Sequence, residues 1–483
     1  MNWRGLFGFC GALLVLSTAC SGGPSTPPAP EAPATIKIMD YSPEQKAFHA
    51  AVAAEYNRTH PNITIDWQSI DQASYKQALP LAFQSKQAPD IFWWKSDNDP
   101  VQTMAEVMKQ GWIRTISPDG TVPQSWVSRW PAGSFQEGVN MKGGKYYGFP
   151  FNDTKIWGPG YMYLNNDVFQ AAGLDETKPP KTWSELTSAC QTIKSKTGKY
   201  CMSTPLKGTD FQRTWYALAG TSMTDLFFDY QNGRFALDNP RLLKAFNFIQ
   251  GLYNAGMVAP GVNDKDFSRK QFAAGQAAVY MDGAWMPGVF AGLNLDTSKY
   301  SVGGPPYPDD GPRGALSQRN TENKYWVSSQ TQYSKQAWDF LQWMSQPAGF
   351  FAQKYIDGSY GTLPFADNSK LASNTGFQAV VKIAMQNSPP LRVKYPEPVV
   401  ACPDVTKSSA MLSADRVHPN WEWQVMVEAL VNKKDLSANA RTVVAGRQSA
   451  FESALTNEKA QGINVSINCY KFPNWNYDQD YKA

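Results

Sequence analysis

The sequence is poor in residues and motifs that indicate histidine, metal or phosphate chemistry. Its 483 residues include 3 histidines, which supply little for a multi-histidine metal site or a histidine base. We find no G-x-S-x-G, H-E-x-x-H, Walker or dinucleotide-binding motif. Lysine and arginine number 45 against 41 acidic residues, and the signs are interspersed, whereas nucleic-acid-binding surfaces concentrate cations. We therefore expect no metal, no cofactor and no nucleic acid.

The sequence also lacks an apolar run typical of a membrane span. The run Leu6–Leu16 is shorter than the about 20 residues that a spanning helix needs. Arg4 precedes it and the small residues Ser17–Ala19 follow, which predicts a secretory signal peptide over 1–19. Cys20 comes next, in an arrangement similar to the bacterial lipoprotein box, where the cysteine receives the lipid. The alternative is an ordinary signal peptide followed by a chance cysteine.

The stretch after Cys20 favours the lipoprotein interpretation. Ser21–Pro33 is rich in proline, serine and glycine and offers almost nothing to bury, so it is expected to stay extended and solvated. Residues 20–34 would then tether a folded body to the cell membrane through the lipid. The protein is accordingly expected outside the cytoplasm.

The rest of the chain has the composition of a globular protein. Hydrophobic residues make up 42% and charged residues 18%, and the length predicts two or three domains. Strand-like segments at Thr35–Asp40, Ile63–Trp67 and Asp90–Trp94 alternate with helical patterns such as the one that begins at Pro43. This alternation predicts an α/β fold.

Four cysteines remain in the predicted body: Cys190, Cys201, Cys402 and Cys469. An even number in an oxidising compartment indicates disulfides, and four cysteines allow three pairings. We favour Cys190–Cys201 and Cys402–Cys469 on proximity in the sequence. No C-x-x-C pair supplies a tetrahedral zinc site.

Three segments have the character of connections between domains. Lys142–Pro150 is a turn followed by a short extended piece, and Ala277–Trp285 is a strand that ends in a glycine turn. A third candidate lies within Gly303–Val327, which is rich in glycine and proline.

From Ile36 to Leu455 the chain resembles the extracellular solute-binding proteins of bacterial ABC sugar importers, the family that includes maltose-binding protein. The order and spacing of several short motifs carry the resemblance. These motifs are Gly144–Pro150, Tyr163–Phe169, Ala172–Leu174, Pro180–Leu186, Phe272–Ala278 and Asp282–Trp285.

The resemblance implies two α/β lobes joined by a multi-strand hinge, with the solute held in the cleft between them. Lobe one would comprise 35–148 plus 287–335, and lobe two 151–284 plus 336–483. It also implies a binding protein rather than an enzyme, with ABC permease subunits as partners and a monomeric state.

A neutral sugar offers hydroxyls at its rim and a flat C–H face, so aromatic rings and fixed polar groups are the expected ligand-binding residues. In open sheets, binding sites lie at the carboxyl ends of the strands, so the candidates are residues that directly follow predicted strands. The family pattern implies hydroxyl-binding groups at Asp40 and Asp97, and stacking at Trp285 and at Trp423 or Trp421. The predicted ligand-binding residues are Asp40, Tyr41, Trp94, Ser96, Asp97, Trp157, Tyr161, Trp285, Tyr360 and Trp423.

Each of these residues has a structural alternative, because aromatic residues after strands are commonly core and Asp40 could cap the next helix. Two other functions also stay open. A glycerol-phosphate-type solute would need a basic cleft, and a secreted glycosidase would need two carboxylates across the scissile bond.

Overall fold

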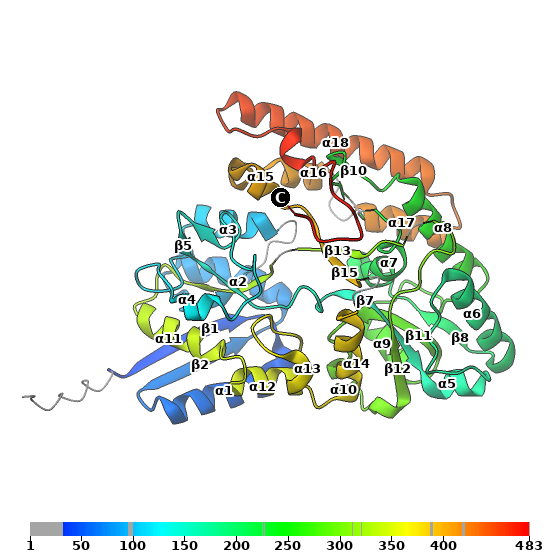
Figure 1. The fold of residues 1–483 in the computed structure, drawn as a ribbon, viewed down its shortest axis with the longest axis horizontal. Helices are drawn as coiled ribbons and strands as arrows, with labels where there is room; N and C mark the ends of the chain where they lie inside the picture. The colour runs from blue at the N-terminus through cyan, green and yellow to red at the C-terminus, as the bar shows by residue number, and fades with distance from the viewer. Residues whose placement is uncertain are drawn as a thin grey trace, which may run out of the picture.

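The computed structural model describes residues 32–94, 100–224, 226, 228–311, 313–319, 321–386, 390–417 and 421–482. The predicted signal peptide, Cys20, most of the tether, Ser96 and Asp97 lie outside the described residues. Figure 1 shows two α/β lobes side by side, with a layer of C-terminal helices across one edge of both. The predicted two-lobed α/β architecture is confirmed.

The first lobe is built on a five-stranded sheet in the order β2-β1-β3-β14-β6. β1 alternates buried and exposed residues, with Ile36 and Ile38 in the core, because successive side chains point to opposite faces. β1 runs parallel to β2 and β3, and β14 runs antiparallel to β3. The strands are β1 Ala34–Asp40, β2 Ile63–Ser69, β3 Ile91–Trp93, β6 Gly148–Pro150 and β14 Asn323–Val327.

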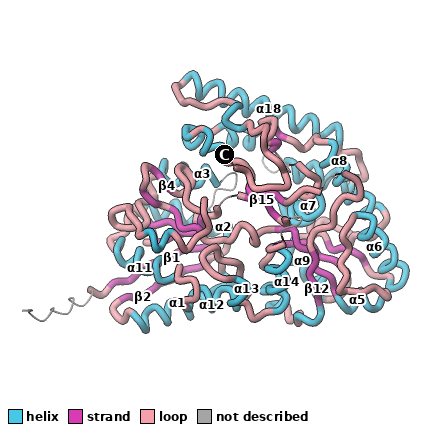
Figure 2. The backbone as a smooth tube through the Cα atoms, viewed as in Figure 1, coloured by secondary structure: helices cyan, strands magenta, loops and turns pink. Residues whose placement is uncertain are grey.

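Helices from two separate stretches of chain cover this sheet (Figure 2). Asp71 begins α2 by accepting a hydrogen bond from the backbone N–H of Ser74, as expected of an N-cap. A hairpin of β4 Met141–Lys142 and β5 Lys145–Tyr146 precedes β6. The helices are α1 Lys46–Thr59, α2 Gln72–Gln84, α3 Pro100–Lys109, α4 Gln124–Val127, α11 Ser334–Met344, α12 Phe350–Asp357 and α13 Asn368–Leu371.

The second lobe has a four-stranded sheet in the order β12-β7-β11-β8. Every residue of β11 is buried, as in a strand covered on both faces. The strands are β7 Pro159–Asn165, β8 Tyr200–Ser203, β11 Ala277–Gly283 and β12 Tyr300–Gly303, with a hairpin of β9 Phe228–Asp229 and β10 Arg234–Phe235. The helices are α5 Asn166–Ala171, α6 Trp183–Thr197, α7 Gln212–Ala219, α8 Pro240–Asn254, α9 Lys265–Ala273, α10 Met286–Gly292 and α14 Thr375–Ala384.

The C-terminal layer bridges the two lobes. Its 3₁₀ helix Pro403–Lys407 lies against α3 of the first lobe, whereas α17 and α18 contact α8 and β10 of the second (Figure 1). The helices are α15 Pro398–Ala401, α16 Ala410–Val417, α17 Trp421–Val431 and α18 Ser437–Ala460. Among the described residues, none of the helices combines the length and apolar character required to cross a bilayer.

The lobe boundaries differ from the predicted ones. β11 and β12 both pair with β7, so Ala277–Trp285 is not a crossing and residues 287–303 belong to the second lobe. The glycine turn that follows β11 leads into α10, and β12 then returns as the antiparallel edge of the same sheet. α11 packs on β1 and α12 on α1, so residues 334–357 belong to the first lobe rather than the second.

In the described residues before the C-terminal layer, the chain crosses between the lobes in three places, the first of which directly follows the predicted segment Lys142–Pro150. The first crossing joins β6 to β7, the second joins β12 to β14 through β13 Leu316–Gln318, and the third joins α12 to α14. β13 pairs in parallel with β15 Arg392–Lys394, which makes a two-stranded ribbon between the lobes (Figure 1). The second crossing falls within the glycine- and proline-rich stretch that the sequence indicated.

Both predicted disulfides form. Cys190–Cys201 joins α6 to β8, and Cys402–Cys469 joins the end of α15 to the segment after α18. A native disulfide typically stabilises a fold by about 2–4 kcal/mol. The second bridge anchors the start of the C-terminal segment to the layer above the lobes.

Candidate functional site

Aromatic side chains form two groups of contacts, one in the first lobe and one where the chain enters the second lobe. Tyr41 stacks on Trp93 with ring centroids 3.9 Å apart. The buried ammonium of Lys324 lies 4.3 Å from the centroid of Trp93 and 5.9 Å from that of Tyr355, within the range of cation–π attraction. Tyr355 contacts Tyr360 at 5.9 Å between centroids. The interlobe aromatic belt, as we name it, consists of Tyr41, Trp93, Lys324, Tyr355, Tyr360, Trp157 and Trp285.

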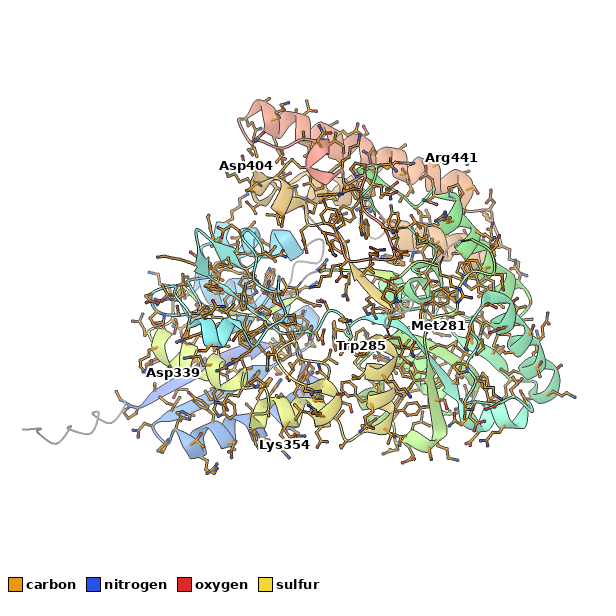
Figure 3. The ribbon with its side chains drawn as sticks, viewed as in Figure 1. Met281, Trp285, Asp339, Lys354, Asp404 and Arg441 are labelled. Carbon is orange, nitrogen blue, oxygen red and sulfur yellow. A yellow bond between two sulfur atoms is a disulfide. The ribbon has the colours of Figure 1, made fainter. Side chains whose placement is uncertain are left out.

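Trp157 and Trp285 form the part of the belt nearest the second lobe. Their ring centroids are 4.7 Å apart, with an angle of 54° between the planes. Both side chains are only partly buried, and Figure 3 places Trp285 on the side of the second lobe that faces the first. The pair joins the first crossing to the turn after β11, so it is in place to respond to movement of the lobes.

Two glycines allow the rings of Trp285 and Trp157 to lie close to the backbone. A Cβ at Gly283 would lie 2.3 Å from the Trp285 ring, because the indole folds back over the end of β11. A Cβ at Gly361 would lie 2.7 Å from the Trp157 ring and 3.0 Å from the Tyr355 hydroxyl. A larger residue at either position would displace a belt ring.

A buried ion network fixes the turn that carries Trp285. The carboxylate of Asp282 is fully buried and lies 2.9 Å from Nη2 of Arg269 and 3.2 Å from Nε of Arg213. It also accepts hydrogen bonds from the Tyr280 hydroxyl at 3.0 Å and the backbone N–H of Gly283 at 2.9 Å. The turn is therefore held from the side of the second lobe.

Two charged residues fix the opposite partner, Trp157. Burial raises the pKa of Asp153 to about 6, and the backbone carbonyl of Asp153 accepts the N–H of Trp157 at 2.7 Å. Arg392 on β15 donates through Nη2 to the carbonyls of Gly158 at 3.0 Å and Pro159 at 2.5 Å. Burial lowers the pKa of this guanidinium, and its contacts are with the first crossing.

The environment of Asp40 is not that of the predicted hydroxyl-binding residue. Its side chain has no exposed area, and it accepts hydrogen bonds from Trp67 Nε1 at 3.1 Å, Ser69 Oγ at 2.5 Å and the backbone N–H of Ser42 at 3.2 Å. His49 lies 3.6 Å away, and burial lowers the pKa of His49 to about 4. These neutral donors satisfy the carboxylate, so Asp40 organises the core of the first lobe.

Tyr161 lies in the core, and Trp94 is partly buried beside Trp112, outside the belt. Tyr161 is fully buried and donates from its hydroxyl to the carbonyl of Ile156 at 2.7 Å. The Trp94 ring packs edge-on against Trp112 at 5.5 Å. Trp93 takes the predicted place of Trp94, because adjacent residues of an extended chain point to opposite sides.

The structure brings four of the predicted residues into the belt, namely Tyr41, Trp157, Trp285 and Tyr360. Trp423 lies on α17, partly buried against the core of the second lobe, where it meets Phe211 at 6.5 Å. The side chain of Trp421, like Ser96 and Asp97, lies outside the described part.

Sequence reasoning missed three belt residues and the acid beside the belt. Trp93 could have been found from strand alternation, since it precedes the chosen tryptophan by one position. Lys324, Tyr355 and Asp153 carry no local signal, because they reach the belt from separate elements.

The chain is similar to known solute-binding proteins. The family model described as bacterial extracellular solute-binding protein matches residues 40–349. The sn-glycerol-3-phosphate-binding periplasmic protein of Brucella abortus is 26% identical over 255 residues, which cover 49% of this chain and 53% of that protein. This chain thus spans about half the length of that relative.

Two further relatives carry names that refer to sugars. The maltotriose-binding protein of Pyrococcus abyssi is 21% identical over 319 residues, covering 66% of this chain and 64% of that one. The crystal structure of the cyclic alpha-maltosyl-1,6-maltose binding protein from Arthrobacter globiformis superposes with a TM-score of 0.62 at 18% identity. That match covers 87% of this chain and all (100%) of the other, and it shows a common fold.

Proposed function

This chain belongs to the bacterial extracellular solute-binding proteins, and we propose that it captures a neutral sugar or oligosaccharide between its lobes. In this proposal it then presents the solute to the membrane subunits of an ABC importer. The observation that supports it most is the partly exposed Trp157–Trp285 pair where the lobes meet.

The belt has the chemistry that a sugar requires. An indole face that removes roughly 60 Å² of apolar sugar surface from water contributes about 1.5 kcal/mol. Two or three such faces, with oriented hydrogen bonds, reach the about −8 kcal/mol of micromolar binding. Relatives whose names specify maltotriose and a cyclic maltosyl sugar support the same class of ligand.

Binding would act through lobe closure. A solute that touches both lobes stabilises the closed state over the open one, because only there does it make both sets of contacts. Trp157 lies within the first crossing and Trp285 follows β11, so movement of the lobes would change the position of this pair.

A glycerol-phosphate-type solute is the second candidate, supported by the name of the Brucella relative. A phosphate would need a free cation at the belt. Lys324 is buried among aromatic rings and Arg392 is engaged with two carbonyls, which favours the neutral sugar. Lys155 and Lys394, whose charges act on Asp153, are the cations that a phosphate would use.

We also propose that Cys20 carries a lipid anchor and that no chemistry follows binding. Cys20→Ser should release the protein from the membrane fraction, and a retained protein would contradict the anchor. Calorimetric titration of the purified protein against mono- and oligosaccharides, polyols and sugar phosphates tests the ligand class. Saturable heat from an unconsumed sugar supports the receptor, whereas product formation would indicate an enzyme.

A further inference from the structure

The C-terminal segment Phe472–Tyr481 is a feature that sugar capture alone does not explain. It follows Cys469, which the disulfide to Cys402 fixes in the C-terminal layer. In Figure 1 the red end of the chain comes down from α18 to the β13–β15 ribbon between the lobes. The segment therefore reaches the centre of the molecule.

Apolar side chains hold this segment against the second lobe and the ribbon. Phe472, Trp475 and Tyr477 are buried in one cluster with Ala315 and Val393. Hydrogen bonds reinforce the contact with the β9–β10 hairpin: the N–H of Phe472 donates to the carbonyl of Tyr230 at 2.7 Å, and the hydroxyl of Tyr477 donates to Asp229 at 3.1 Å.

The segment also bonds to both strands of the ribbon. The N–H of Ala315, next to β13, donates to the carbonyl of Tyr477 at 3.1 Å. On β15 the N–H of Lys394 donates to the carboxylate of Asp480 at 2.8 Å, and the N–H of Tyr481 donates to the carbonyl of Lys394 at 2.9 Å. β15 is thus held on one side by β13 and on the other by the chain end.

β15 in turn is connected to the aromatic belt. It carries Arg392, whose guanidinium bonds to the carbonyls of Gly158 and Pro159, the two residues directly after Trp157. Because Arg392 is buried, a shift of β15 has to move the turn that bears Trp157. A series of direct contacts therefore connects the chain end to the Trp157–Trp285 pair.

We propose that Phe472–Tyr481 is a positioning segment of the ligand site, which sets the orientation of Trp157 through β15 and Arg392. Its effect on affinity rests on the proposed sugar binding. Its effect on the Trp157 turn does not, so the two can be tested apart.

The test compares four variants of the full-length protein. One is truncated after Lys471 and keeps the Cys402–Cys469 bridge, and Asp480→Ala removes the acceptor for Lys394. Asp480→Asn retains an acceptor oxygen at that place, and Gln479→Ala changes the neighbouring exposed side chain as the matched control.

The ligand-free readout is hydrogen exchange of the Trp157 amide, which is bonded to Asp153. We expect exchange at Trp157 to rise in the truncated protein and in Asp480→Ala, beyond any rise in α1 or α6. Asp480→Asn and Gln479→Ala should match the unaltered protein. Unchanged exchange at Trp157, or an equal rise throughout the molecule, would overturn the proposal.

The second readout is calorimetric affinity for maltotriose, used as the probe. Loss of one hydrogen bond predicts about threefold weaker binding in Asp480→Ala, and loss of the whole segment about tenfold. If the unaltered protein binds no saccharide, the proposed function is wrong. The hydrogen-exchange result at Trp157 then decides by itself whether the segment has a positioning role. If the truncated chain does not fold, Asp480→Ala decides it.

Discussion

Asp40 and Asp282 lie at the ends of strands in different lobes, and neither carboxylate has exposed surface. Neutral groups surround Asp40, namely an indole N–H, a serine hydroxyl and a backbone N–H. Two guanidinium groups face Asp282. The same position in a strand thus supports a neutral core network in one lobe and an ion network beneath Trp285 in the other.

The difference lies in what each lobe has to hold in place. In the first lobe the acid joins β1 to β2 and to α1, all of which are already packed in a core. In the second it holds an irregular turn whose Trp285 must face the other lobe. Charge-assisted hydrogen bonds are shorter and roughly twice as strong as neutral ones, which suits a buried turn that has to hold the partly exposed indole of Trp285 in place.

The largest expected effect is that of Asp282→Ala. It would leave the buried guanidinium of Arg269 and the partly buried guanidinium of Arg213 without their shared partner, at a cost of about 3–5 kcal/mol in the free energy of unfolding. Urea denaturation measures this. Asp266→Ala removes the 65% exposed partner of Arg269 and should cost under about 1 kcal/mol. Equal losses in the two variants would contradict the ion network.

Asp40→Ala should have a smaller effect on stability, about 1–3 kcal/mol, because it leaves neutral donors rather than charges unpaired. Asp40→Asn, which keeps one acceptor oxygen, should cost less. The measurement is again urea denaturation, combined with sugar titration. If Asp40→Ala abolished binding at unchanged stability, the original prediction of a hydroxyl-binding Asp40 would be right.

Trp285→Ala should act on binding rather than on folding. Loss of a stacked indole face costs about 1.5 kcal/mol, or roughly tenfold in Kd, by calorimetry. Trp94→Ala is the matched control, because Trp94 packs against Trp112 in the first lobe, and it should lower stability while leaving Kd unchanged. The reverse pattern would place the site at Trp94.

A further effect concerns pH and the surroundings of Asp40. Burial lowers the pKa of His49 from its ordinary value of 6.5 to about 4. Between these two pH values the unfolded chain binds a proton at His49 and the folded chain does not, so the free energy of unfolding decreases as the pH is lowered. This histidine therefore costs about 2 kcal/mol of stability at pH 5 relative to pH 7.5. The loss should be smaller in His49→Gln, as unfolding at the two pH values would reveal.

Asp153 acts in the opposite direction over part of the same range. Its pKa is raised to about 6, so the folded chain holds a proton that the unfolded chain has lost, and stability falls as pH rises from 4 to 6. Asp153→Asn should remove that fall. A His49→Gln variant with an unchanged pH profile would show that His49 is not buried as described.

The fold could be predicted further than the site. Strand alternation at Ile36 and Ile38 and the N-cap at Asp71 are local signals that the structure follows. The predicted crossing at Ala277–Trp285 was wrong. The sequence of a glycine turn that leads into a helix is the same whether the next strand joins the same sheet or a different one. Strand partners are long-range facts.

The amino-acid sequence by itself indicated the α/β class and favoured the two disulfide pairings, since periodicity and cysteine spacing are local features, and the two-lobed arrangement followed from the resemblance to a known family. Tertiary structure alone decided that Trp93 rather than Trp94 joins the belt, that Asp40 is core, and that the chain end reaches β15. Burial and partnership depend on which distant segments meet, and only the folded chain brings those segments together.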